Sequence, residues 1–241
     1  MTPVAEQIAA RHTGLVARLR RAAAAAGRDP DGFRIVAVSK GMPVEAVRAA
    51  RQAGLHRFGE NRVQEALAKI AALSEAEWHL VGHLQSNKAR AAARAFAMIH
   101  SVDSLPLLRR LEKIAHDEGL RPVLLLQVNV TAEASKSGFA AERLASETAR
   151  PGSELLTLLR QLRHVRVEGL MTIAAADRDA RQTFATLREL RDRLSDSLGT
   201  LLPELSMGMS GDAEAAVAEG ATLVRIGTAL FGPRPDHHRP A

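Results

Sequence analysis

One lysine, Lys40, ends an apolar run near the start of the chain. The run covers residues 33–39, and because side chains alternate along a strand, Lys40 shares a face with Val36 and Val38. An amine at the edge of an apolar core and near other positive charge has a lowered pKa, so it can attack an aldehyde as the neutral nucleophile. The alternative interpretation is a lysine whose amine simply extends into solvent.

Two segments near the end of the sequence combine small residues with hydroxyl groups. Residues 208–212 (GMSGD) lead into a helical pattern, and Gly227 and Thr228 follow the last apolar run. Small residues let backbone N–H groups approach a phosphate, and the start of a helix favours an anion. Ser210, Gly227 and Thr228 are therefore candidate phosphate ligands, although such residues are also common in ordinary turns.

Arg225 is a charged residue inside the apolar segment 222–226. A charge among buried apolar side chains is costly unless a partner accompanies it. Arg225 therefore either faces a ligand or lies on the outer face of a sheet and extends past a helix. Its position alone favours neither interpretation. Asn61 is a further polar candidate, because it follows the short strand predicted at 56–58.

Two other sets of side chains are weaker candidates. Lys136 follows the most apolar run of the chain and could compete with Lys40 for an aldehyde, but a solvated loop lysine is the simpler interpretation. His79 and His83 are four residues apart, a spacing that suits a metal ion on a helix and not across the end of a strand. We therefore predict no metal site.

Apolar runs typical of buried strands alternate with helical patterns along the whole chain. Strands are predicted at residues 33–39, 56–58, 78–81, 98–101, 123–130, 165–171, 204–206 and 222–226. Helices are predicted at residues 3–27, 44–53, 61–73, 87–96 with Ser86 as the N-cap, 105–118, 177–198 and 212–219, and in a helical region divided by Pro151 and Gly152.

Eight strands, each followed by a helix or helical turn, are the number that closes a barrel. The length of 241 residues also suits one such domain. We predict an α/β fold, a single (β/α)8 TIM barrel over residues 33–232. A helical lead-in at 1–32 would precede it, and a disordered tail at 233–241 would follow it. A doubly wound open sheet is the alternative.

Function in such a barrel collects where the strands end, and the loops after strands seven and eight often hold a phosphate. Lys40 and Asn61 end the first two predicted strands. Ser210, Gly227 and Thr228 fall in the loops after the seventh and eighth. The barrel therefore predicts that the candidate residues share one end of the molecule.

The composition excludes several classes of function. The sequence contains no Cys, which excludes disulfides, thiolate chemistry and cysteine ligation of zinc. The net charge is +6, but the arginines alternate with Asp and Glu, as in residues 181–196, so we expect no nucleic-acid partner. No apolar run suits a signal peptide or a membrane span, and we therefore expect a cytoplasmic protein.

A series of short motifs, in unbroken order from about residue 33 to 232, resembles those of the pyridoxal-phosphate homeostasis proteins. The motifs are AVSK (37–40), FGEN (58–61), VQE (63–65), WH (78–79), LQSNK (84–88), SKSG (135–138), GLM (169–171), LSMGMS (205–210), Asp212 with EAA (214–216), and VRIGT (224–228).

The resemblance implies a barrel like the N-terminal domain of alanine racemase, of fold type III, that binds pyridoxal 5'-phosphate. Lys40 would carry the cofactor as an aldimine. The other residues that the resemblance assigns to the cofactor are Ser210, Gly227 and Thr228 at the phosphate, Arg225 at the pyridine nitrogen and Asn61 beside the ring.

The resemblance also implies a function without catalytic turnover. The chain would serve the intracellular homeostasis of the cofactor by storage, delivery and buffering. Its partners would be the cofactor and apo forms of enzymes that depend on it, and the chain would act as a monomer.

The alternative function is a fold-type-III enzyme, such as an amino-acid racemase. The alanine racemase family places a lysine and a tyrosine on opposite faces of the imine, and this sequence contains no Tyr. It also ends at Ala241, before any second domain of the racemase kind. We therefore expect no racemase activity, unless a histidine such as His83 replaces the missing base.

The segment beside Lys40 departs from the family pattern. Gly41 and Met42 stand where relatives commonly carry Thr and another polar residue, and Arg62 stands where many relatives have Tyr. The shape and polarity of the site next to Lys40 are therefore expected to differ from those of the relatives.

Overall fold

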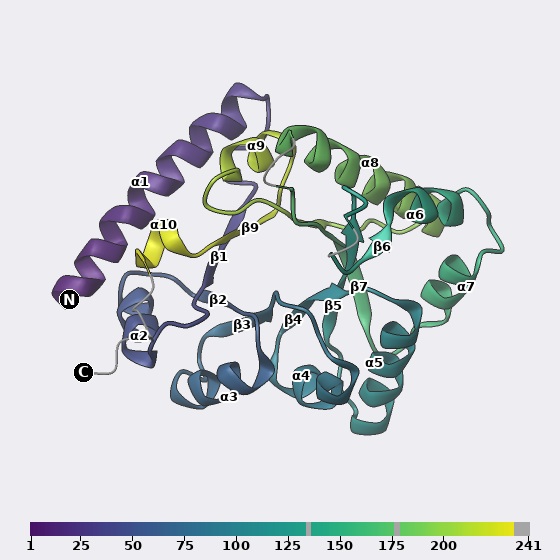
Figure 1. Ribbon diagram of the computed structural model, residues 1–241, viewed down its shortest axis with the longest axis horizontal. Coiled ribbons are helices and arrows are strands. Elements are labelled where there is room, and N and C mark those ends of the chain that lie inside the picture. Colours follow the sequence, from purple (N-terminus) through teal and green to yellow (C-terminus); the bar gives the residue numbers. More distant parts are fainter. Residues whose placement is uncertain (134–135, 176–178, 234–241) are drawn as a thin grey trace.

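The computed structural model describes residues 1–133, 136–175 and 179–233. Within these ranges, eight parallel strands form a closed ring with helices around it (Figure 1). The strands of the ring are β1 (Arg34–Val38), β2 (Arg57–Glu60), β3 (Glu77–Leu80), β4 (Met98–Val102), β5 (Val123–Asn129), β7 (Arg166–Met171), β8 (Glu204–Ser206) and β9 (Leu223–Ile226).

The ring closes because its strands pair in chain order and the last strand pairs with the first. Residues 34–37 of β1 lie in parallel register with residues 223–226 of β9. A short strand, β6 (Phe139–Ala140), pairs with the end of β5 and lies outside the ring. The predicted (β/α)8 barrel is therefore confirmed, and the doubly wound open sheet is wrong.

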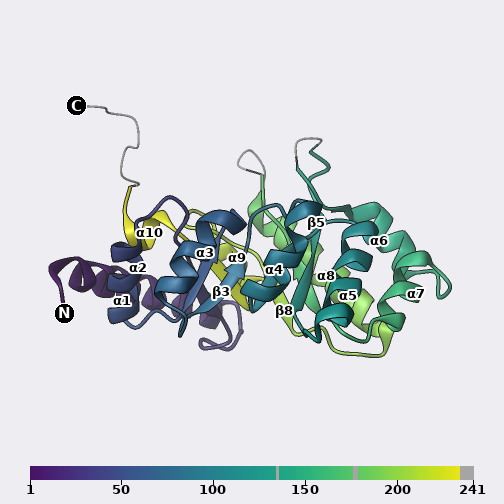
Figure 2. The ribbon, with the colours of Figure 1, turned by 90° about the horizontal axis from the view of Figure 1, so that it is seen from below.

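Helices cover the outside of the ring, and Figure 2 shows α3, α4 and α5 following one another along it. The helices are α1 (Pro3–Ala25), α2 (Val44–Gln52), α3 (Val63–Ala72), the 3-10 turn η1 (Ser86–Lys88), α4 (Ala89–Ala95), α5 (Leu105–Glu118), α6 (Ala141–Thr148), α7 (Glu154–Gln161), α8 (Ala180–Leu198), α9 (Ala213–Ala218) and α10 (Thr228–Phe231).

The predicted lead-in helix is α1, and it packs on the outside of the barrel against α2, α9 and α10. Thr2 caps its first turn by accepting a hydrogen bond from the Ala5 N–H, at 3.3 Å. Its buried side chains, which include Ile8, Leu15 and Leu19, belong to the same apolar cluster as the barrel strands. The boundary predicted at residue 32 therefore has buried contacts on both sides.

Some local predictions need correction. Ser86 is not an N-cap but the first residue of η1, so the predicted helix begins with a 3-10 turn. The strand β6 was not predicted, because two residues give no readable alternation. The predicted tail lies almost entirely outside the described residues, which end at 233.

A second apolar cluster fills the interior of the ring. Its side chains come from strands on all sides and are Val36, Val81, Met98, Val123, Leu125, Met171 and Leu223. Polar residues also lie buried in the interior, and Ser206 and Arg225 are two of them. The apolar cluster forms the floor on which the site at the carboxyl ends of the strands rests.

Candidate functional site

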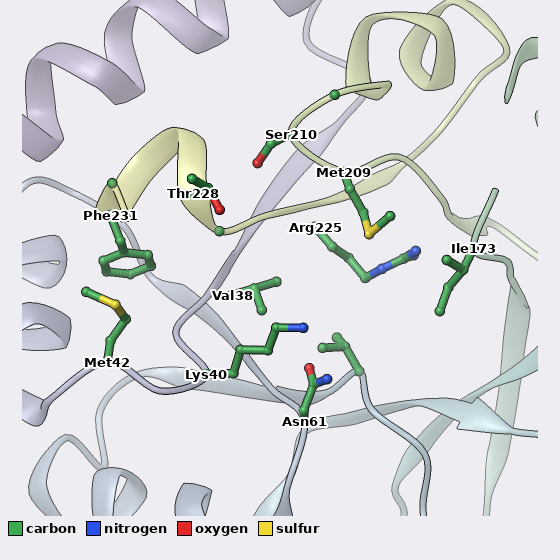
Figure 3. Close-up of a pocket in the computed structure, with 14 residues that line it drawn as sticks. Val38, Lys40, Met42, Asn61, Ile173, Met209, Ser210, Arg225, Thr228 and Phe231 are labelled. Carbon is green, nitrogen blue, oxygen red and sulfur yellow. The ribbon is translucent and has the colours of Figure 1, made fainter. Parts of the chain in front are cut away.

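The predicted site residues line one cavity of about 340 Å³ at the carboxyl ends of the strands (Figure 3). A cavity of this size is at the small end of the range for ligand sites. The predicted residues that line it are Lys40 after β1, Asn61 after β2, Ser210 before α9, Arg225 on β9, and Gly227 and Thr228 at the start of α10. Apolar side chains, among them Val38, Val81 and Ile173, complete the wall.

The Lys40 side chain points into the cavity, toward the side from which Arg225 enters, and Asn61 lies beside it (Figure 3). Lys40 is half-buried, so its amine is neither sealed from water nor free in bulk solvent. The Lys40 amine is therefore directed into the cavity and does not simply extend into solvent. Whether Lys40 carries a cofactor stays a prediction.

Backbone hydrogen bonds on both sides hold the turn at Lys40. The Ser39 carbonyl accepts hydrogen bonds from the Lys69 ammonium at 2.8 Å and from the Met42 N–H at 3.0 Å. The Gly41 N–H donates to Glu65 Oε1 at 2.6 Å. Gly41 has a φ of 70°, in the left-handed region that favours glycine, which gives a physical reason for Gly at this position.

Behind this turn lies a buried group that we call the Lys69 cluster, formed by Ser39, Glu60, Glu65 and Lys69. Lys69 donates to Glu60 Oε1 at 2.8 Å and to Glu65 Oε1 at 2.9 Å. Ser39 Oγ donates to Glu60 Oε1 at 2.6 Å. Glu60 is fully buried and Lys69 is 6 % exposed, so the cluster is shielded from water.

The pKa values of the two carboxyl groups in the Lys69 cluster are shifted in opposite directions. Burial raises the pKa of Glu60, and the hydrogen bonds from Lys69 and Ser39 only partly oppose it. Burial would also raise the pKa of Glu65, but the hydrogen bonds from Lys69 and from the Gly41 N–H outweigh it and lower that pKa. Sequence reasoning missed the cluster, and the four-residue spacing of Glu65 and Lys69 on α3 was the one signal available.

The two loops predicted to bind phosphate lie next to each other. Ser210 Oγ accepts a hydrogen bond from the Ala229 N–H at 3.3 Å, which joins the loop before α9 to the start of α10. A Cβ on Gly227 would lie 3.3 Å from the Val38 carbonyl oxygen, so the small residue lets the chain pass close to β1. Ser210 and Thr228 are exposed toward the cavity, where their hydroxyl groups can donate.

Arg225 enters the cavity from the interior of the barrel and is 5 % exposed. Its guanidinium donates to Ser206 Oγ at 2.6 Å and to the Thr172 carbonyl at 2.7 Å. Burial lowers the pKa of Arg225 to about 10, so the side chain remains cationic at neutral pH. The outer-face interpretation of Arg225 is therefore wrong. None of the ion pairs among the described residues includes Arg225.

The weaker candidates lie elsewhere. Lys136 forms an ion pair with Glu133 at 2.7 Å and does not line the cavity. His79 is buried in the barrel, whereas His83 is exposed and pairs with Asp103 at 3.0 Å. Over the ranges that the structure describes, no three His, Asp or Glu side chains are grouped as a metal site would need.

Nothing among the described helices combines the length and the apolar character that crossing a membrane requires.

The family model described as alanine racemase, N-terminal domain, matches residues 14–235. The pyridoxal phosphate homeostasis protein of Pseudomonas aeruginosa is 49 % identical over 247 residues, which cover 100 % of both chains. The homologous protein of Aquifex aeolicus is 41 % identical over 222 residues, 90 % of this chain and 94 % of that protein. This chain belongs to the pyridoxal phosphate homeostasis protein family. The predicted resemblance is confirmed.

Solved structures agree with this membership. PipY of Synechococcus elongatus is 43 % identical and covers 93 % of this chain. Its structure without pyridoxal phosphate (PLP) has a TM-score of 0.81 to this chain, and its structure with PLP bound has a TM-score of 0.79. The alanine racemase of Corynebacterium glutamicum is 15 % identical with a TM-score of 0.69, which shows a shared fold alone. This family member matches 63 % of that racemase chain.

Proposed function

We propose that this protein binds pyridoxal 5'-phosphate in the cavity at the carboxyl ends of its strands and serves the homeostasis of that cofactor. One observation carries the proposal: Lys40, Arg225 and the hydroxyl groups of Ser210 and Thr228 line a single cavity. The relative PipY, which is 43 % identical, has a structure described as having PLP bound.

The residues present fit the chemical groups of this cofactor. Lys40 supplies a primary amine for a covalent imine bond to the aldehyde. Ser210, Thr228 and the backbone at Gly227 supply hydrogen-bond donors for the phosphate. Arg225 brings a buried cation that forms no ion pair with any carboxylate in the described part of the chain. Together these groups match an aldehyde, a phosphate and a ring acceptor within one small cavity.

Arg225 has a particular consequence if it faces the ring nitrogen. A guanidinium only donates hydrogen bonds, so the nitrogen it contacts must act as an acceptor and stay unprotonated. The cofactor supplies electron-sink chemistry when bound, and an unprotonated ring is the weaker sink. This contact therefore favours holding the cofactor over using it.

We also propose that the protein binds without catalytic turnover. The absence of Tyr from the sequence removes the second base of the racemase pattern, and the relatives carry the name of homeostasis proteins. The one observation that favours an enzyme is the pair of His83 with Asp103, which could orient an imidazole as a base. His83 does not line the cavity, so we rank that function second. Action in the cytoplasm, a monomeric state and delivery to apo-enzymes remain predictions.

A titration of cofactor-free protein with pyridoxal 5'-phosphate tests the proposed function. Absorbance should show saturable binding of a single equivalent, and the double variant Lys40→Ala, Arg225→Leu should lose it. Circular dichroism of the variant serves as the control for folding. The proposal is wrong if the wild-type protein shows no saturable binding, or if the folded double variant binds as the wild type does.

A further inference from the structure

A continuous line of polar side chains, buried except for its last member, runs from the cavity through the interior of the barrel. Arg225 donates to Ser206 Oγ at 2.6 Å, and Ser206 Oγ lies 2.8 Å from His100 Nδ1. His100 Nε2 lies 2.9 Å from His79 Nδ1, and His79 Nε2 lies 2.8 Å from Glu77 Oε1. Four strands of the ring, β9, β8, β4 and β3, contribute to this line.

One arrangement of hydrogens forms every hydrogen bond of this line. A guanidinium cannot accept, so Ser206 Oγ accepts from Arg225, which leaves the Ser206 hydroxyl hydrogen available for His100 Nδ1. A neutral imidazole that accepts at Nδ1 carries its hydrogen at Nε2, and His100 therefore donates to His79 Nδ1. His79 in turn donates from Nε2 to the Glu77 carboxylate. Every donor has an acceptor, from the cation to the anion.

The charges of the neighbouring groups agree with this direction. Burial lowers the pKa of His100 well below its usual value, and the nearby Arg225 guanidinium lowers it further, so His100 is neutral. The hydrogen bond from His79 lowers the pKa of Glu77, which keeps its carboxylate ionised. Glu77 also forms an ion pair with Arg57 at 3.0 Å, which holds the far end of the line.

The apolar surroundings strengthen each of these hydrogen bonds. His79, His100 and Ser206 are fully buried, and the apolar cluster that includes Met98 and Leu125 fills the interior of the ring around them. In an apolar interior a hydrogen bond is stronger than in water and an unpaired polar group is costly. The Thr172 carbonyl holds the other side of the Arg225 guanidinium, and Ser206 is the side-chain acceptor on which its orientation depends.

We propose that Ser206, His100, His79 and Glu77 form a positioning relay that fixes the orientation of Arg225 toward the cavity. None of the four lines the cavity, so each would act on the ligand only through Arg225. This inference rests on the proposed function, because it takes Arg225 to face the ring nitrogen of pyridoxal 5'-phosphate. It goes beyond that function by assigning residues on the far side of the barrel to cofactor recognition.

The relay predicts an effect confined to the ring nitrogen. Binding should be compared for pyridoxal 5'-phosphate and for its 1-deaza analogue, in which a C–H group replaces that nitrogen. His100→Leu should weaken binding of the natural cofactor about ten-fold or more, as expected for a lost hydrogen bond to a charged group, and leave the analogue unchanged. His79→Leu keeps the contact between Ser206 and His100, so its effect should be smaller.

Matched variants separate positioning from packing. Met98→Leu changes a neighbouring apolar side chain of the barrel interior and should not discriminate between the two ligands. His100→Gln keeps one acceptor and one donor and should restore part of the affinity. If His100→Leu weakens both ligands equally while Arg225→Leu discriminates between them, the relay is packing alone and the inference fails.

The same comparison of the two ligands distinguishes a failure of the relay from a failure of the proposed contact between Arg225 and the ring nitrogen. If Arg225→Leu itself does not discriminate between the two ligands, Arg225 does not face the ring nitrogen, and the contact and the relay fall together. A measurement on the wild-type protein without cofactor keeps the inference testable should the His100 variants not fold. Nitrogen-15 NMR should find the hydrogen of His100 on Nε2 and not on Nδ1, and a hydrogen on Nδ1 of His100 would overturn the relay.

Discussion

Replacing Lys69 with methionine would remove the cation that holds the turn at Lys40. Methionine is flexible and apolar, so it can occupy the space without a charge or a donor. The change deletes the hydrogen bonds of Lys69 to the Ser39 carbonyl, to Glu60 and to Glu65. It leaves Glu60 fully buried without its counter-ion.

The expected cost follows from this burial. The Lys69 side chain is 7 % exposed and that of Glu60 is 0 % exposed, so solvent screens the pair very little. Removing one partner of such a buried pair typically costs about 3–5 kcal/mol of unfolding free energy. Some of this cost is avoided at low pH, because Glu60 can then take up a proton.

The pH dependence has a definite sign. Burial raises the pKa of Glu60 above 4.5, and Lys69 opposes that rise, so the pKa rises further in Lys69→Met. A raised folded-state pKa contributes stability that is present below the unfolded value and is lost as the pH rises through the folded value. The destabilisation by Lys69→Met should therefore be larger at about pH 8 than at about pH 5.5.

Urea unfolding of the cofactor-free protein at the two pH values measures this effect. Lys113→Met is the matched control, because Lys113 forms an ion pair with Asp117 on the surface and its side chain is 76 % exposed. That control should cost less than about 1 kcal/mol. The double variant Glu60→Gln, Lys69→Met should recover most of the loss. A cost for Lys69→Met no larger than that of Lys113→Met, or equal at both pH values, would refute the reasoning.

Three further predictions concern the ligand. Ser210→Ala should weaken binding of pyridoxal 5'-phosphate about ten- to a hundred-fold and weaken binding of pyridoxal much less, and equal losses would place the phosphate elsewhere. Lys136→Ala should leave the affinity for the cofactor unchanged, because Lys136 pairs with Glu133 away from the cavity; a large loss would bring that loop into the site. The cofactor-loaded protein should not exchange the α-proton of L-amino acids in deuterated water, and catalytic exchange that Lys40→Ala abolishes would establish an enzyme.

The barrel could be predicted because short strand-like runs alternate with helical patterns along the chain, and the run that forms β5 is strongly apolar. Even the brief run predicted at 56–58 is present, as β2, although the strand extends to Glu60. The strand β6 and the 3-10 turn at Ser86 were missed because such short elements leave no periodic pattern in the sequence.

The cavity residues could be predicted because strand ends in a barrel meet on one side, and the closed ring brings Lys40 and Arg225 to the same cavity. The buried polar groups behind these cavity residues could not be predicted. His100 and Ser206 are 106 residues apart in sequence. They are in contact only because the closed ring directs both side chains, from β4 and β8, into its interior. In the sequence, Lys69 is one more charged residue on an amphipathic helix. Only the packing of α3 on β2 brings its ammonium group to Glu60.

The most direct test of the account is the site of covalent attachment. The protein loaded with pyridoxal 5'-phosphate is reduced with borohydride, digested, and its peptides are mapped by mass spectrometry. The account predicts a pyridoxyl group on the peptide that contains Lys40 and loss of this adduct in Lys40→Ala. An adduct found mainly on Lys136, together with a full imine absorbance in Lys40→Ala, would contradict it.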